Sequence, residues 1–342
     1  MKYLEKLCHI EISTENNKQF CKAERIIRIN MFNSLIKIKI NREHFNLKYI
    51  YYKLLKISFG RNKACSIYLR KYEKDVQKAL SNYENTQENG QSGSVWSMWW
   101  QDDIPPIIQI CLNTIKQFYP NLIIITQKNV SEYIDIPEYM LKKFNDGIIA
   151  LPHFSDYIRL CLLEKYGGMW IDSSCLMVDK VPTFITKQPF FILQAPDKKS
   201  ISNFFIQAHK HNYIIKNLKL FIEKYYKKET CTIDYFLFHQ YFMLSINKNN
   251  LFKIIYDNII PDVNNKIKYL TDNHKKNADK DCWDFLKKTS YMYKIGRKSS
   301  YALENKNSWY WFIMNEYKDY IDTPETIAHV ERERESNPPN GV

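Results

Sequence analysis

Three charged residues that lie close together in the sequence could bind an anionic ligand. Asp156 and Arg159 are three positions apart, and Asp172 follows a short apolar run, all within "HFSDYIRLCLLEKYGGMWIDSS" at 153–174. Residues at i and i+3 share one face of a helix. Arginine pairs with phosphate through two hydrogen bonds, and a carboxylate can hold a metal that binds phosphate. The structural alternative is a surface ion pair and a turn-forming aspartate.

A predicted helix and a predicted strand place these residues at one edge of a sheet. Ser155 is a candidate N-cap for a helix that begins at Asp156, whose carboxylate suits the positive end of the helix dipole. The Gly167-Gly168 pair predicts a helix stop and a sharp reversal. The segment 169–171 then reads as a buried strand that delivers the second aspartate to its carboxyl end.

Alternating strand and helix patterns precede this stretch. Strands are expected at 95–100 and 121–126, and helices at 105–119 and 136–147, the last with Gly147 as its stop. This alternation predicts a mostly parallel central sheet with helices on both faces, in which ligands bind outside the carboxyl ends of the strands. After about Pro189 the pattern changes to helices rich in aromatics and lysines, beginning with 203–211.

The first ninety residues read as a basic, mainly helical extension. They contain 18 basic and 9 acidic residues, with strand-like alternation in 26–40 and helical patterns at 49–57 and 64–83. The polar segment 84–94 is a predicted linker. A main domain is expected at 95–325, with a first half at 95–188 and a helical second half at 189–325, and the tail at 326–342 is expected to be disordered.

The net charge of +13 raises the question of a nucleic-acid partner. Most of the excess lies before the central motif, and no RNP signature, zinc-finger spacing or recognition-helix pattern accompanies it. The interpretation is therefore no nucleic acid, but an anionic membrane surface or an acidic glycan.

Cysteine usage and hydropathy predict the compartment. Eight cysteines occur with no Cys-x-x-Cys pair, which argues against a zinc ribbon or a redox motif and fits a reducing cytosol. No run approaches the roughly 18 apolar residues of a membrane span, and the N-terminus lacks the apolar core of a signal peptide. We expect a cytoplasmic protein. Residues 1–90 either attach it peripherally to the inner face of the cell membrane or pack onto the main domain with their lysines solvated.

The order Ser-Asp-x-x-Arg … Tyr-Gly-Gly-x-Trp-x-Asp at 155–172, with "WSMWWQDDIPPIIQICLNTIKQFYPNLIIITQKNV" upstream, resembles the capsular polysaccharide synthesis glycosyltransferase family. The resemblance is strong over 95–181 and weak through 234–242 and 290–298. It implies a GT-A type nucleotide-diphospho-sugar transferase fold, a nucleotide-sugar donor, a divalent cation (Mn²⁺ or Mg²⁺) and a glycan or lipid-linked acceptor. It also implies anomeric retention, for which no dedicated base is demanded.

By position, Asp172 matches the acidic anchor of the Asp-x-Asp site, and Asp156 and Arg159 match the pair near the donor sugar and nucleotide. Trp100 and Gln101 match the nucleotide-side wall. In this reading 95–188 is the donor-nucleotide half and 189–325 the acceptor side.

The second aspartate of the motif is replaced by Ser174. A divalent metal favours hard oxygen ligands, so Asp172 and Ser174 alone predict a weak site unless another residue completes it. His239 is the candidate, although it reads equally well as a helix-face histidine in an aromatic core. Asp179 is expected on a surface turn.

A basic cluster near the C-terminus could stabilise a departing diphosphate. Lys294, Arg297 and Lys298 form this cluster, for which the alternative is a solvated loop. The sequence thus predicts a hexosyltransferase that uses a UDP-sugar and acts on a surface polysaccharide or its lipid-linked precursor. The alternative is a non-catalytic carbohydrate- or nucleotide-sugar-binding protein on the same scaffold.

Overall fold

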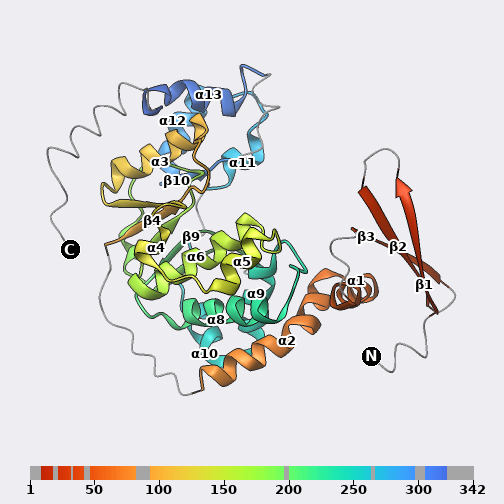
Figure 1. Ribbon diagram of the computed structural model, residues 1–342. Helices are drawn as coiled ribbons and strands as arrows, with labels where there is room; N and C mark the ends of the chain where they lie inside the picture. Colours follow the sequence, from red (N-terminus) through yellow and green to blue (C-terminus); the bar gives the residue numbers. More distant parts are fainter. Residues whose placement is uncertain are drawn as a thin grey trace. The chain divides into compact units, whose positions relative to one another are not determined.

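The computed structural model describes residues 9–17, 22–31, 34–41, 47–81, 93–195, 200–262, 266–296 and 305–321, the first three ranges as backbone strands only. The chain packs as two compact units (Figure 1). The first contains Met1–Tyr83, Ile136–Phe154 and Asn217–Asn250, and the second contains Glu84–Asp135, Ser155–Lys216 and Leu251–Val342. The sequence suggested domain boundaries between residues 90 and 95 and between residues 325 and 326. These boundaries stay predictions.

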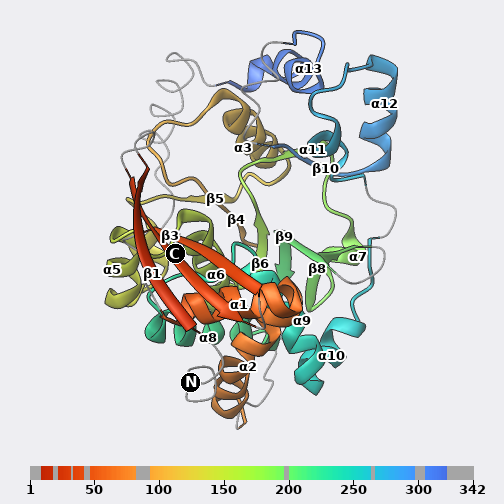
Figure 2. The same cartoon turned by 90° about the vertical axis from the view of Figure 1, so that its right-hand side faces the viewer.

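The second unit is built on a five-stranded sheet with the order β5-β4-β6-β9-β8. β4 pairs in parallel with both β5 and β6, β9 runs antiparallel to β6, and β8 runs antiparallel to β9. Four of the five strands therefore share one direction, which confirms the mostly parallel α/β sheet (Figure 2). The strands are β4 (Val95–Met98), β5 (Leu122–Ile125), β6 (Gly168–Ile171), β8 (Phe190–Gln194) and β9 (Ile201–Ala208).

Strand order reverses at β4. The chain leaves β4 through α3 (Pro106–Phe118) to β5, and returns past β4 to β6 through α6 (Leu151–Tyr166). Right-handed crossovers in opposite directions put their helices on opposite faces of a sheet, and α3 and α6 lie on either side of β4 (Figure 1). The carboxyl ends of β4 and β6 thus form a switch point, the usual ligand site of such sheets.

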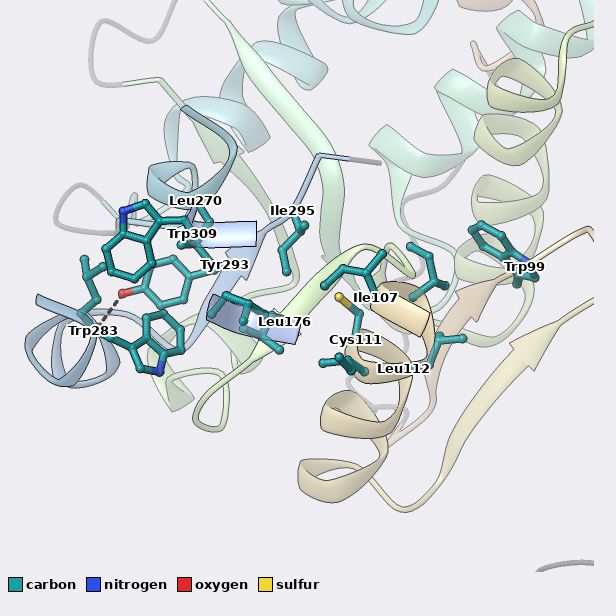
Figure 3. Close-up of a cluster of buried hydrophobic side chains, with 14 residues drawn as sticks. Trp99, Ile107, Cys111, Leu112, Leu176, Leu270, Trp283, Tyr293, Ile295 and Trp309 are labelled. Carbon is teal, nitrogen blue, oxygen red and sulfur yellow. Dashed lines mark hydrogen bonds between the residues drawn. The ribbon is translucent and has the colours of Figure 1, made fainter. Parts of the chain in front are cut away.

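A small two-stranded sheet and a hydrophobic cluster join the C-terminal segment to α3 (Figure 3). Leu176 and Ile107 pack with the fully buried Trp283 and Tyr293. This cluster holds the two antiparallel strands β7 and β10 in place. The contributing elements are α3, β7 (Cys175–Met177), α11 (Tyr269–Asn273), α12 (Lys280–Thr289), β10 (Met292–Lys294) and α13 (Trp309–Glu316). Shorter helices are α4 (Val130–Tyr133), α7 (Thr183–Thr186), α10 (Asn250–Asp257) and η3 (Lys318–Tyr320).

The first unit has an antiparallel three-stranded sheet and a helical core. Helices α1 and α2 agree with the helical patterns predicted there, and strands β2 and β3 agree with the strand-like alternation in 26–40; the antiparallel strand β1 was not expected. The hydroxyl of buried Tyr72 donates to the buried carboxylate of Glu229, which ties α2 into the core. The elements are β1 (His9–Asn17), β2 (Lys22–Met31), β3 (Ser34–Asn41), α1 (Leu47–Phe59), α2 (Arg61–Ala79), α5 (Glu138–Asn145), most of α8 (Tyr213–Lys228) and α9 (Leu237–Lys248).

The helix predicted at 203–211 is wrong, because residues 201–208 form β9, which pairs antiparallel with β8 at 190–194. The register shifts at Ile192/Leu193: Ile192 pairs with Ile206 and Leu193 with Ser202. Residues 203–205 of β9 therefore have no paired residue on β8. A short apolar run in a strand buried on both faces lacks strict alternation, so its pattern does not separate strand from helix.

Several predictions fall outside the described residues: most of the 84–94 linker, Arg297, Lys298 and the 326–342 tail. Among the helices that the structure describes, none combines the length and apolar character needed to cross a bilayer.

Candidate active site

A double-glycine turn sets the position of β6. Gly167 and Gly168 have φ of 70° and 96°, where side chains are strained. A Cβ atom on Gly168 would lie 2.2 Å from the Ser94 carbonyl oxygen, and one on Gly167 would lie 2.6 Å from the Lys210 nitrogen. The expected stop and reversal after α6 are therefore confirmed, and only glycine lets β6 start this close to its neighbours.

Asp172 directly follows β6 at the carboxyl edge of the sheet. Its backbone N–H donates to the Phe204 carbonyl at 2.9 Å, which fixes the main chain. Its Oδ1 accepts from the Trp170 indole N–H at 2.7 Å, and its Oδ2 accepts from the Lys294 ammonium at 2.7 Å. Both carboxylate oxygens are thus held by donors from separate parts of the chain.

Arg159 lies between the two carboxylates. Its Nη2 is 3.4 Å from Oδ1 of Asp156 and 3.4 Å from Oδ1 of Asp172, and its guanidinium stacks 4.8 Å from the Trp170 ring centroid. The side chain is only 6% exposed. The three charged residues that the sequence singled out therefore meet, and the surface ion-pair alternative does not hold.

Ser155 has a different role from the predicted N-cap. α6 begins at Leu151, so Ser155 lies one turn inside the helix. Its carbonyl and its hydroxyl accept from Arg159, at 3.3 Å and 3.2 Å respectively. The helix extends back to Leu151 because Pro152 lies in its first turn, where a missing N–H breaks no helical hydrogen bond, and the serine instead orients the guanidinium.

Two residues of β9 complete the site, and sequence reasoning missed both. Asn203 donates from its amide to Oδ1 of Asp156 at 2.8 Å, while its carbonyl accepts from Arg159. The Phe204 ring lies under the Lys294 ammonium, at 5.0 Å from its centroid. Both belong to the unmatched stretch of β9, a signal hidden by the incorrect helix prediction.

The two carboxyl groups differ in their pKa values. Burial raises the pKa of Asp156 to about 6, although Arg159 opposes that rise. Burial also pushes the pKa of Asp172 upward, but the charges of Lys294 and Arg159 outweigh it and hold that pKa below its ordinary value. Asp172 is therefore an anion across the neutral range.

The remaining predicted site residues lie in three places. Trp100 and Gln101 follow β4, the strand beside β6; Trp100 is half-buried and its carbonyl accepts from Gln127 at 2.8 Å. Ser174 is buried, and its carbonyl accepts from the Ile295 N–H at 2.9 Å, beside Lys294.

His239 lies on α9 in the first unit, where its ring stands edge-on to Phe236 and Phe238 at 5.4 and 5.8 Å. Its suggested metal role stays a prediction. Asp179 is exposed, and its carboxylate accepts from the Lys180 N–H in a surface turn, as expected.

The site's donor set does not fit a tightly held divalent cation. Ser174 offers a hydroxyl and no carboxylate, and Asp172 already bonds Lys294 and faces Arg159. Within the part of the chain that the structure describes, no three His, Cys, Asp or Glu side chains are grouped to hold a metal ion. Calcium and magnesium sites need several oxygen ligands from protein or substrate.

The model of a family described as capsular polysaccharide synthesis protein matches residues 47–313, more than half of the sequence. The chain belongs to this family. The match begins where α1 begins and ends within α13, so the family region includes the two N-terminal helices. The family resemblance read from the sequence is confirmed, and the observed α/β architecture agrees with the GT-A-like fold it implies.

One curated relative is the O-glycosyltransferase braB of Annulohypoxylon truncatum. It is 28% identical over 147 residues, which cover 36% of this chain and 35% of that protein. The chain thus spans about a third of the length of this relative.

Proposed function

We propose that the protein is a glycosyltransferase that moves a hexose from a nucleotide-sugar, with a UDP-sugar as the expected donor. The acceptor is a hydroxyl of a surface or capsular polysaccharide or of its lipid-linked precursor. Family membership and the name of the curated relative support this proposal. The observation that carries it is the convergence of Arg159 and Lys294 on Asp172 at the switch point of the sheet.

The site suits the chemistry of sugar transfer. When the bond between the sugar C1 and the diphosphate oxygen breaks, its electron pair stays on the diphosphate, and fixed cations stabilise that charge. Lys294 and Asp172 are the accessible charges, at 19% and 26% side-chain exposure, whereas Arg159 lies behind them. Arg159 therefore orients Asp156 and Asp172, and Lys294 faces the ligand.

Retention is part of the proposal. The acceptor oxygen bonds C1 on the face that the diphosphate leaves, and the acceptor proton passes to the departing diphosphate oxygen. No side-chain base is needed for this balance, which agrees with a site whose low-pKa carboxylate, Asp172, is already paired with a cation.

A screen of nucleotide-sugars tests the proposal. Purified protein is incubated with UDP-glucose, UDP-galactose, UDP-N-acetylglucosamine and GDP-mannose, with and without Mn²⁺, and released nucleoside diphosphate is measured. Slow hydrolysis of at least one donor is expected, because water can replace the missing acceptor. Thermal stabilisation by a donor without any hydrolysis would instead support the non-catalytic binding protein.

An anionic membrane surface is the proposed working place. At the end of α1, Ile57 and Phe59 are 55% and 51% exposed, beside the exposed Lys56 and Lys63. Apolar side chains that enter the lipid interface next to cations that face the headgroups are typical of peripheral membrane contact. Part of the apolar content of α1 is structural, because Tyr52 is buried in its own unit.

A further inference from the structure

The position where a divalent cation would be expected holds a protein cation. The ammonium of Lys294 lies 2.7 Å from Oδ2 of Asp172, the carboxylate that corresponds to the acidic anchor. The other oxygen of Asp172 accepts from Trp170 and faces Arg159. A metal that used this carboxylate would have to displace Lys294 or compete with two donors.

The backbone of Lys294 is fixed on both sides. In β10 it pairs with Cys175 of β7, its N–H donates to the Ile267 carbonyl at 2.7 Å, and its carbonyl accepts from the Thr271 hydroxyl. The next residue, Ile295, donates to Ser174. The charge is therefore placed before any ligand arrives, as electrostatic stabilisation requires.

The ammonium keeps donors for a ligand. A lysine carries three N–H groups, of which Asp172 takes one and the Phe204 ring covers another side. The Lys294 side chain is partly exposed, whereas the guanidinium of Arg159 is almost fully buried. An incoming diphosphate therefore meets Lys294 as the accessible fixed cation among these residues.

We propose that Lys294 takes the place of the divalent cation, so that this protein binds a nucleoside diphosphate and transfers the sugar without a metal. This inference rests on the proposed function. In the step, the C1–O(diphosphate) bond breaks with its electron pair on the diphosphate, and the Lys294 ammonium neutralises that oxygen. The acceptor oxygen forms the new bond to C1 and gives its proton to the diphosphate.

The first test needs no variant. UDP, GDP, ADP and dTDP are titrated into the full chain by calorimetry, once with EDTA and once with Mn²⁺, and donor hydrolysis is followed under both conditions. The diphosphate affinity with EDTA is expected to agree with that measured with Mn²⁺ within about twofold, and so is the rate of donor hydrolysis. A diphosphate affinity more than tenfold tighter with Mn²⁺, or hydrolysis that EDTA abolishes, overturns the inference and leaves the proposed function standing.

Variants of Lys294 test whether this residue binds the diphosphate. Lys294→Met keeps the apolar stem over Phe204 and removes the charge, so diphosphate affinity is expected to fall at least tenfold with or without Mn²⁺. Lys294→Arg should retain metal-independent binding. Lys288→Ala, an exposed lysine of α12 in the same unit, removes the same net charge and should bind as the wild type does.

Two further results count against the inference. Lys294→Met with wild-type affinity, in protein that melts cooperatively, shows that another group binds the diphosphate. Protein that neither binds a nucleoside diphosphate nor hydrolyses a donor under either condition contradicts the proposed function and this inference together. Because the EDTA comparison uses the wild type, a Lys294→Met variant that fails to fold leaves the test intact.

Discussion

The Nζ atom of Lys294 lies 2.7 Å from Oδ2 of Asp172, although 122 residues separate them in the chain. The pairing of β10 with β7 brings them together, and the cluster around Trp283 and Tyr293 holds that pairing (Figure 3). The C-terminal segment is thus part of the candidate site, since it supplies the cation that pairs with Asp172.

Asp172→Asn tests the anchor. The change keeps the volume of the side chain and removes the charge that positions Lys294, so sugar transfer is expected to fall at least about a hundredfold. The rate of donor hydrolysis measures this, with circular dichroism to verify the fold. Activity above about a tenth of wild type would show that the anchor is assigned wrongly.

Arg159→Ala tests whether this arginine belongs to the site or to the surface. Removing one partner of a buried ion pair costs about 3 kcal/mol of stability, and donor affinity should weaken by more than about 1 kcal/mol. Urea unfolding and calorimetry measure the two effects.

Lys142→Ala is the matched control. It breaks the exposed i,i+4 pair of Lys142 with Asp146, which should change stability by less than about 0.5 kcal/mol. Equal effects of the two variants on stability would contradict the special role of Arg159.

Local patterns predicted the first half of the site well. The strands and helices from 95 to 171 are close to their expected positions, because each has a distinct apolar period and a glycine or proline boundary. Asp156, Arg159 and Asp172 could be placed together, since the parallel order brings a helix and a strand end to one edge. The helix was predicted to begin at Asp156 but begins at Leu151, because Pro152 lies in its first turn, where proline is tolerated.

The other half depends on long-range pairing that no local pattern reveals. Asn203 and Phe204 reach the site because the hairpin of β8 and β9 loses register there. Lys294 was suggested only as one member of a basic cluster, and its ion pair with Asp172 depends on strands 115 or more residues apart in sequence. Short apolar runs such as 204–206 carry no period that separates strand from helix.

Gly168→Ala tests the double-glycine turn. Its Cβ would lie 2.2 Å from the Ser94 carbonyl oxygen, so the backbone must move, and stability should fall by more than about 3 kcal/mol. Gly147→Ala is the control: its φ of 72° is also positive, but nothing lies within 4 Å of the added atom. That variant should lose about 1 kcal/mol. If the urea midpoint falls by the same amount in both variants, the contact with Ser94 does not reduce stability.

His153→Phe tests a pH dependence of stability in the first unit. Burial lowers the pKa of His153 from 6.5 to about 4, against the opposing charge of Asp234. The unfolded chain therefore binds this proton below about pH 6.5, while the folded chain resists it down to about pH 4. Stability from this residue is complete above pH 6.5 and declines as pH falls toward 4.

Between pH 7.5 and pH 4.5, the wild type should lose about 2 to 3 kcal/mol more unfolding free energy than His153→Phe, which has no proton to bind. Urea denaturation at the two pH values measures both. A loss of the same size in the two proteins would show that His153 titrates normally.

Sedimentation with vesicles tests the membrane proposal. Full-length protein should bind vesicles that contain phosphatidylglycerol at low salt and be released at high salt, because headgroup attraction is screened. The double change Ile57→Ser and Phe59→Ser should abolish binding, since it removes the exposed apolar side chains at the end of α1. Phe285→Ser, an equally exposed aromatic of α12, should bind as the wild type does.

Point changes are the correct probe here, because deleting residues 1–90 would also remove Tyr72, the partner of buried Glu229, and damage the first unit. Each variant is compared with the wild type by thermal melting before sedimentation. Neutral vesicles of phosphatidylcholine alone should bind the protein weakly, since they lack the negative charge that attracts Lys56 and Lys63. If full-length protein does not bind anionic vesicles even at low salt, α1 serves packing alone and the membrane proposal is wrong.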